Sequence, residues 1–284
     1  MNTIRKISTK WWREEANKPV TVLILLFQLL SFGVLFPSLF SWSGVFIAIG
    51  LYWISGGLGI TLCYHRLLTH KSFETPKWVR YVLTTFACLT WQGPPKTWVG
   101  THRYHHKHSD DDLDPHSPKH GFTWSHITWV LTKSPDGFDA SQFAKDLDKE
   151  PFMRFLDTFW WLPQILLMII LGIVGWITQD ILLGLSWMVW GGPFRTTLVY
   201  HFTWFVNSAA HTWGYRNFQT SDNSRNLWWV ALLSWGEGHH NNHHGEPSSA
   251  AHGMKWFELD PTYWTINIMS WFGLASNIKR PKKL

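Results

Sequence analysis

The sequence has little charge and almost no cysteine. Charged residues make up 15% of its 284 residues, compared with about 25% in an average soluble domain. A disordered chain or a coiled coil is rich in charge and poor in aromatic residues, so the composition excludes both. Two cysteines, Cys63 and Cys88, are too few for a zinc ribbon or a disulfide framework. Both lie in apolar stretches, which indicates small core residues.

A stripe of lysine and arginine that would bind nucleic acid is also missing. The formal net charge is +6 at pH 7, but basic residues cluster at the two ends of the chain, up to Lys18 and from Lys279 to Lys283. Such clusters favour contact with an anionic membrane surface over nucleic acid. We therefore expect membrane lipid, and no nucleic acid, among the partners.

Long apolar runs and tryptophan, which occurs 22 times, are abundant. Four runs approach or exceed the roughly 20 residues that a helix needs to cross a bilayer: about 20–40, 42–63, 159–178 and 181–206. The basic segment before the first run is typical of a signal peptide, but no small-residue cleavage pattern follows it. In the fourth run we expect Arg195 to extend to the headgroups. Two shorter runs, 78–91 and 227–235, predict interfacial or buried helices.

The connecting segments indicate how the four predicted spans are oriented. The turns near Pro37 and at 178–180 contain no Lys or Arg, whereas the N-terminal segment, the middle segment and the tail do. The positive-inside rule then places both termini and the middle segment in the cytoplasm. The sequence predicts one all-α integral membrane domain over residues 1–284. It consists of two helical hairpins and a cytoplasmic helical cap, formed by about 64–156 and 207–284.

Eight of the 16 histidines fall in three clusters. The sequence is H-R-L-L-T-H over 65–70, H-R-Y-H-H over 102–106 and H-N-N-H-H over 240–244. In the last two clusters, spacings of three and four residues place the imidazoles on one helical stripe. The first cluster has a spacing of five, so its histidines share a face only where the helix ends or bends. The predicted topology brings all three clusters to the same side of the membrane.

Eight histidines exceed the needs of a single metal. One zinc takes about four ligands and a haem takes one or two, so the clusters indicate two metal ions side by side. The spans lack the Glu-x-x-His pairs of carboxylate-bridged di-iron bundles. An all-imidazole pair beside an apolar cavity favours iron acting on dioxygen, because zinc has no redox chemistry. A metal-chelating tract of low complexity would lack this regular spacing.

The three clusters and their surroundings resemble the membrane-bound fatty acid desaturases, in their stearoyl-type (delta-9) branch. The resemblance covers roughly residues 50–275 and includes the segments 114–116, 121–126, 203–211 and 236–244. It implies four transmembrane helices and a cytoplasmic cap that holds two irons, with nine histidine ligands and a metal-bound water held by an asparagine. The implied ligands are His65, His70, His102, His105, His106, His211, His240, His243 and His244, with Asn207 for the water.

The histidine at position 239 departs from the family pattern, which usually has an aromatic residue there. A register that uses His239 is geometrically possible, but we favour His240 because it preserves the H-x-x-H-H spacing. The remaining histidines are expected at the surface, in hydrogen bonds or behind the ligands: His108, His116, His120, His126, His201, His239 and His252. Four carboxylates are close enough in sequence to accept hydrogen bonds from ligand imidazoles: Asp110, Asp114, Glu237 and Glu246.

The resemblance implies an O2-dependent oxidoreductase with two Fe2+ ions. It removes two hydrogens from adjacent methylenes of a saturated acyl chain, carried on lipid or CoA, and leaves a cis double bond of the delta-9 type. Two electrons and two protons are consumed, and both oxygen atoms leave as water. The acyl chain has no polar group along its length that the protein could bind, so a tunnel must select which carbon–carbon bond is desaturated. We expect Trp91 and Trp204 to line this tunnel.

No H-P-G-G haem signature of a fused cytochrome is present. We therefore expect a separate electron donor of the ferredoxin or cytochrome type. The basic tail, Lys279–Lys283, would steer an acidic donor, and anchoring to anionic lipid explains it equally well.

Two other functions stay open on the sequence. The same histidine boxes serve di-iron hydroxylases and ketolases of this superfamily, which retain an oxygen atom in the product. A non-enzymatic divalent-metal transporter would also use membrane histidines. Such a transporter would place them within its spans, whereas these clusters lie at the predicted span exits.

Overall fold

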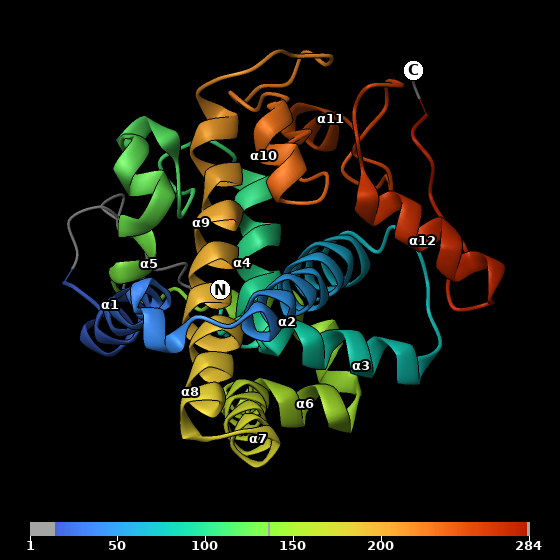
Figure 1. Ribbon diagram of the computed structural model, residues 1–284. Coiled ribbons are helices and arrows are strands. Elements are labelled where there is room, and N and C mark those ends of the chain that lie inside the picture. The colour runs from blue at the N-terminus through green and yellow to red at the C-terminus, as the bar shows by residue number, and fades with distance from the viewer. Residues whose placement is uncertain (1–14, 136, 283–284) are drawn as a thin grey trace.

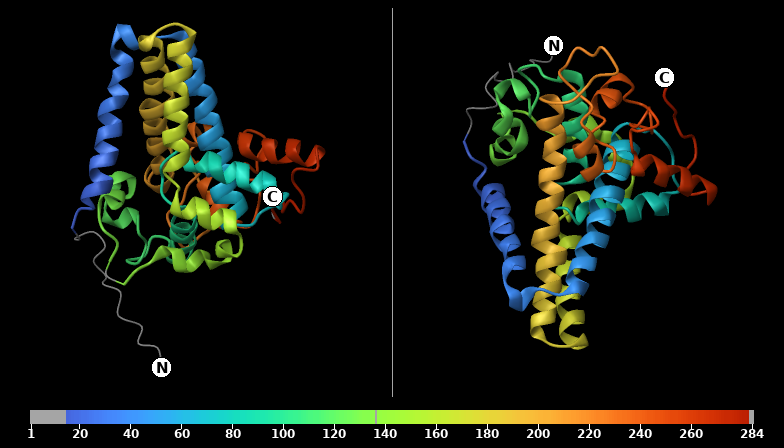
Figure 2. Two further views of the ribbon diagram at one scale, coloured as in Figure 1. Left: turned by 90° about the horizontal axis from the view of Figure 1, so that it is seen from below. Right: turned by 45° about the horizontal axis from the view of Figure 1, so that its top comes forward.

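The structure is a computed structural model that describes residues 15–135 and 137–282. Within these ranges all regular elements longer than an isolated β-bridge are helices, which confirms the all-helical prediction. Long helices run side by side and project from a cap of shorter ones (Figures 1 and 2). Two described helices are long and apolar enough to cross a membrane, Lys18–Leu35 and Trp42–Thr69. A bent pair, Pro151–Thr158 with Leu162–Thr178, raises this number to three if it forms one span.

The first hairpin consists of α1 (Lys18–Ser31), the 3-10 turns η2 (Phe32–Leu35) and η3 (Pro37–Leu39), and α2 (Trp42–Tyr52). Ser41 caps α2, because its hydroxyl accepts a hydrogen bond from the N–H of Gly44. α2 continues directly into the π-helical segment η4 (Trp53–Thr69). The helix predicted to leave the membrane at about residue 63 therefore extends to Thr69, and it carries the first histidine cluster.

The second hairpin consists of α7 (Leu162–Thr178), α8 (Ile181–Val189), the π-helical η8 (Trp190–Phe194) and α9 (Arg195–Asn207). The last three form one continuous helix, and its wider π-helical turn accommodates Pro193, which has no N–H to donate. α7 and α8 lie side by side (Figure 1). They approach closely at two glycines, because a Cβ on Gly175 would lie 2.7 Å from the Cα of Gly184.

Arg195 does not extend to the headgroups, so that expectation is wrong. Its side chain is fully buried at the start of α9. The guanidinium donates hydrogen bonds to Gln164 Oε1 and to the carbonyl of Leu89, both at 2.7 Å. It also donates to Ser55 Oγ and to the carbonyl of Gly191, both at 3.1 Å. These partners come from four different segments, and satisfying the buried donors inside the protein costs less than leaving them in lipid.

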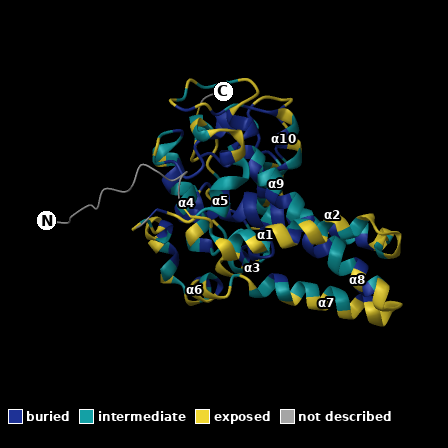
Figure 3. Ribbon diagram, turned by 90° about the vertical axis from the view of Figure 1, so that its left-hand side faces the viewer, coloured by how far each residue is buried: buried dark blue, intermediate teal, exposed yellow. Residues whose placement is uncertain are grey.

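The cap is built from short helices that lie between and after the hairpins. Its elements are α3 (Lys77–Cys88), α4 (Pro95–His108), η5 (Pro118–His120), η6 (Trp124–Thr128), α5 (Trp129–Leu131), η7 (Ala140–Lys149), α6 (Pro151–Thr158), η9 (Ala209–His211), α10 (Trp228–Leu233), α11 (His240–Gly245) and α12 (Pro261–Trp271). The two shorter apolar runs form α3 and α10, as predicted. Buried residues concentrate around α4, α9 and α10, whereas the far ends of α7 and α8 are exposed (Figure 3).

Arg195→Lys is expected to destabilise the folded protein by on the order of 3 kcal/mol, because a single ammonium cannot reach all four acceptors. The midpoint of thermal denaturation in detergent measures this loss. Arg154→Lys is the matched control, since Arg154 is exposed and makes one hydrogen bond to a backbone carbonyl. Equal midpoints for the two variants would contradict the structural role of Arg195.

Candidate metal centre

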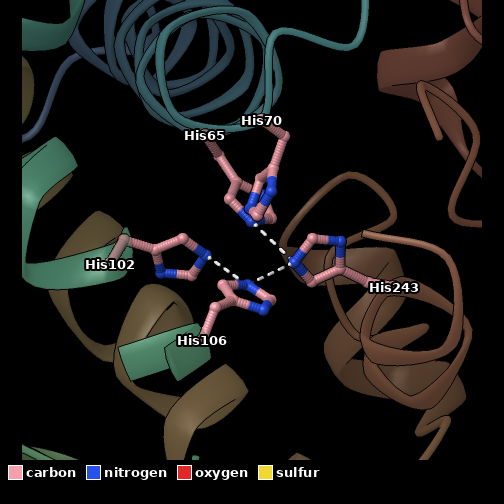
Figure 4. A group of neighbouring side chains, drawn as sticks. All are labelled: His65, His70, His102, His106 and His243. Atoms are coloured by element: carbon pink, nitrogen blue, oxygen red, sulfur yellow. Dashed lines mark hydrogen bonds between the residues drawn. The ribbon is translucent and has the colours of Figure 1, made fainter. Parts of the chain in front are cut away.

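Five of the predicted ligands form one group, which comes from three parts of the chain. The rings of His65, His70, His102, His106 and His243 point toward a common centre (Figure 4), and one nitrogen of each lies within 4.8 Å of the others. The Nε2 atoms of His65 and His243 are 3.1 Å apart. The Nε2 of His106 lies 3.0 Å from that of His102 and 2.8 Å from that of His243. Such close nitrogens form the arrangement that a shared metal ion requires.

π-helical winding brings His65 and His70 together. In η4 the N–H of His70 donates to the carbonyl of His65 at 3.1 Å, an i to i+5 hydrogen bond. Residues five apart therefore lie one above the other, and the two ring centroids are 4.8 Å apart. An α-helix would place two histidines five residues apart on different faces, whereas the π-helical turn brings both to one site. π-helical turns are frequent at functional sites.

The other four predicted ligands form a second group: His105, His211, His240 and His244. The Nε2 atoms of His240 and His211 are 3.0 Å apart, and the ring of His244 lies 4.3 Å from that of His240. The two groups are adjacent, because the rings of His106 and His244 stack with centroids 4.6 Å apart. All nine predicted histidines are thus brought together as five and four. His239 lies outside both groups, and its Nε2 donates to the carbonyl of Leu259.

Carboxylates lie next to the outer nitrogen of four of these imidazoles, and those of Asp114 and Asp222 form hydrogen bonds with it. A carboxylate next to Nδ1 fixes the tautomer, so that Nε2 faces the centre without a proton. The Nδ1 to oxygen pairs are His65–Glu237 at 2.5 Å, His105–Asp114 at 3.0 Å, His211–Asp110 at 3.1 Å and His244–Asp222 at 2.7 Å. Three of these acids were predicted. Sequence reasoning missed Asp222, which is remote from His244 along the chain, and Glu246 forms no such pair among the described residues.

Two further histidines adjoin the groups without joining them. His252 Nδ1 lies 3.1 Å from Glu237 Oε2, and His116 Nδ1 lies 3.6 Å from Asp114 Oδ1. Each therefore shares a carboxylate with one of the predicted ligands. This placement agrees with their expected position behind the ligands, and no spacing in the sequence indicated which carboxylate each would contact.

The electrostatics favour neutral imidazoles at most of these positions, whereas the carboxylate of Asp114 outweighs burial and raises the pKa of His105. Burial and then the neighbouring imidazoles lower the pKa of His70, His102, His106 and His243 well below the usual value. Burial also lowers the pKa of His244 to about 4. Neutral rings keep a lone pair available to a cation at physiological pH.

Several inward nitrogens are buried and have no hydrogen-bond partner among the described residues, including Nε2 of His70, His105 and His244. An unpaired buried polar atom costs about 1–3 kcal/mol, so several of them facing each other indicate a bound cation. A set of nine imidazole nitrogens, without thiolate or carboxylate ligands, suits borderline transition metals. These residues fit two iron ions, one for each group.

An apolar cavity of about 370 Å³ reaches the centre from one side. His65, His102 and His240 form part of its wall, and Asn207 lines it beside them. The two predicted tunnel residues, Trp91 and Trp204, both line this cavity. Its size lies within the range of small-molecule pockets, about 300–1,000 Å³.

Residues with left-handed backbone conformations surround the cavity and the centre. Trp91 and Trp235, which line the cavity, have φ of 51° and 50°. Asp110, the partner of His211, has φ of 61°, and Lys71 after His70 has φ of 50°. A residue with a side chain costs about 1–3 kcal/mol in this conformation. The surrounding fold therefore holds these residues in place at the site.

A second, polar cleft of about 840 Å³ reaches the centre from another direction. His70, His106 and His244 line it, together with polar and charged residues such as Lys107 and Asp111. The described part of the chain therefore places the histidine groups between an apolar cavity and a polar opening.

Comparison with known proteins agrees with this geometry. A profile of the fatty acid desaturase family matches residues 16–267. The sn-1 stearoyl-lipid 9-desaturase of Anabaena variabilis is 49% identical over 91% of this chain and 93% of its own length. The sn-1 stearoyl-lipid 9-desaturase of Synechocystis sp. is 45% identical over 86% and 74%, and the sn-2 palmitoyl-lipid 9-desaturase of Nostoc sp. is 44% identical over 87% and 85%. The chain belongs to the fatty acid desaturase family, and it is a membrane-bound oxidoreductase that desaturates fatty acyl chains.

Proposed function

We propose that this desaturase places a cis double bond at the delta-9 position of a saturated chain carried on a membrane lipid. Two Fe2+ ions are held by the nine histidines, and O2 is the co-substrate. The observation that carries the proposal is the division of these histidines into groups of five and four beside an apolar cavity. When bound, two irons supply the oxidising chemistry that couples reduction of O2 to removal of hydrogen from carbon.

The residues of the chain supply position and a dry environment. The carboxylates next to Nδ1 of His65, His105, His211 and His244 help these four rings to keep their orientation through the reaction. Asn207 lines the same cavity as His240, and we propose that its amide holds a water at the centre. Aromatic walls, including Trp91 and Trp204, exclude bulk water and align one carbon–carbon bond with the ligands.

The lipid carrier is supported by the relatives and by the polar end of the cavity. Two of the relatives are named for stearoyl-lipid and one for palmitoyl-lipid. The polar end is formed by Asn17, Thr132, Lys133 and Ser134, next to the start of α1. Its lysine is already ion-paired with Glu15 at 2.6 Å. Among the described residues, this end offers hydrogen bonds to a lipid ester and carries little of the positive charge that several CoA phosphates would require.

Electrons are proposed to come from a separate donor of the ferredoxin or cytochrome type. The polar cleft at His70, His106 and His244 supports this, because it opens the centre toward water on a side that the acyl chain does not use. Protons and product water can follow the same route. We place the donor at this cleft instead of at the basic tail.

We also propose four spans in one domain over residues 1–284, with both termini and the centre in the cytoplasm. α1 with η2, α2 with η4, α7, and α8 with η8 and α9 all project from the cap in one direction (Figure 2). The two hairpin turns lie together at the end remote from the cap. Their lack of Lys and Arg, against the basic segments on the cap side, supports this orientation.

Expression in a host without desaturases, supplied with a suitable reductant, tests the proposed reaction. A new cis delta-9 double bond in membrane lipid, identified by gas chromatography and mass spectrometry, is the expected product. A product that retains an oxygen atom on the acyl chain, as a hydroxyl or a keto group, would indicate the hydroxylase or ketolase alternative. Unchanged lipids despite iron-loaded protein would contradict the proposal. Membership of an enzyme family leaves the transporter hypothesis without support.

Asp222→Asn is expected to lower the affinity for iron by about 10- to 100-fold, because the amide no longer holds the Nδ1 proton of His244 as a carboxylate does. Iron retained per protein after dialysis against graded chelator measures this change without any assay of activity. Glu246→Gln is the matched control, since Glu246 forms no ion pair with a histidine among the described residues. The assigned role of Asp222 is wrong if both variants retain iron as the unmodified protein does.

Trp235→Leu is expected to shift the products toward longer acyl chains. Trp235 lines the cavity and packs against Tyr52 with ring centroids 4.3 Å apart. Tyr52 precedes His65 by thirteen residues on the same continuous helix, so we expect this pair to close the part of the cavity remote from the ligands.

The chain-length profile of desaturated lipids in the expression host checks this shift. Trp228→Leu is the control, because Trp228 is exposed on α10 and does not line the cavity. An active Trp235→Leu variant with an unchanged chain-length profile would show that the rings of Trp235 and Tyr52 do not limit the length of the acyl chain.

A further inference from the structure

We propose that α12 is an in-plane membrane anchor, whose outer face inserts into the lipid leaflet on the cap side. Four large apolar side chains form this outer face: Trp264, Ile268, Trp271 and, directly after the helix, Phe272. They are 52%, 46%, 77% and 73% exposed. Trp264, Ile268 and Trp271 are spaced by four and three residues, which places them on a single helical stripe, and Phe272 follows Ile268 by four residues. An exposed stripe of this kind marks a contact surface.

The opposite face of α12 is fixed against the rest of the protein. Ile266 is fully buried in the main core. The hydroxyl of Thr262 lies 2.8 Å from that of Thr61 in η4. The orientation of the helix is thereby set, and the outer stripe cannot turn inward. α12 is apolar on both faces, one toward the protein core and one toward the outside.

Its position favours lipid as the occupant of the outer stripe. α12 packs on η4, which is the cap-side end of the second membrane-spanning helix. It lies across the direction of the long helices, on the side of the cap from which they project (Figure 2). α12 therefore lies on the side of the cap that faces the projecting helices.

The composition of the segment agrees with a membrane interface. Tryptophan is the residue most typical of the boundary between lipid and water, and two of the four stripe residues are tryptophan. The exposed basic residues Lys279, Arg280 and Lys282 follow α12, and they provide the charge that attracts anionic headgroups. A protein partner would require neither feature.

The anchor is linked to the metal centre through one carboxylate. Asp260 Oδ1 accepts the N–H of Tyr263 and so begins α12. Asp260 Oδ2 accepts a hydrogen bond at 2.9 Å from Arg66, which follows His65 in η4. Lipid contact at α12 therefore fixes the height of the cap, and of its histidines, above the leaflet.

Site-directed fluorescence labelling tests the anchor. Both native cysteines, Cys63 and Cys88, are buried, so Trp264→Cys and Trp271→Cys each introduce one accessible thiol for an environment-sensitive dye. Gln142→Cys on η7, exposed and outside α12, is the matched control. Labelled proteins that keep the elution profile and thermal midpoint of the parent are placed singly in nanodiscs of phosphatidylcholine and phosphatidylglycerol.

Labels on α12 are expected to emit at shorter wavelength than the control label. Spin-labelled lipid is expected to quench them several-fold more strongly, and aqueous iodide several-fold less. Equal iodide quenching of the α12 and control labels would overturn the proposal. Protection of the α12 labels only after a second copy or an electron donor is added would also overturn it, because the stripe would then bind protein.

Discussion

The buried guanidinium of Arg66 joins the parts of the chain that build the centre. It donates to Glu237 through Nε and Nη2 at 3.1 Å, to Asp260 at 2.9 Å and to the carbonyl of Ala250 at 2.6 Å. A buried charge is tolerated only when its donors are satisfied in this way. Glu237 in turn contacts His65 and His252. One cation therefore fixes the end of the second long helix, the segment before α11 and the start of α12 relative to each other.

Helical geometry explains how one repeated motif serves two groups. In α4, His102 and His106 are four residues apart and belong to the first group, while His105 belongs to the second. In α11 the assignment is reversed, because His240 and His244 belong to the second group and His243 to the first. Each helix thus gives an i, i+4 pair to one group and a single ring to the other. Because α4 gives its pair to the first group and α11 gives its pair to the second, each helix contributes to both groups and the groups lie side by side.

The sequence predicted the helices and the clusters, because apolar runs and histidine spacings are local signals. Long-range contacts were not predictable in this way. Arg195 was expected at the headgroups, but it is buried because acceptors on three other segments reach it. Asp222 contacts His244 only because the loop before α10 folds back over α11. His211 was implied by family resemblance alone, since no cluster surrounds it in the sequence.

The two openings of the centre have opposite character, and the proposed reaction needs both. The apolar cavity removes water from the acyl chain, whereas electrons and protons must arrive from an aqueous side. His65 lines the cavity and His70 lines the polar cleft, although η4 brings their rings together. The π-helical winding of this one segment therefore does more than gather two ligands. It also places the histidines between the apolar cavity and the polar cleft. The residues that would bind iron therefore also separate the acyl chain from water.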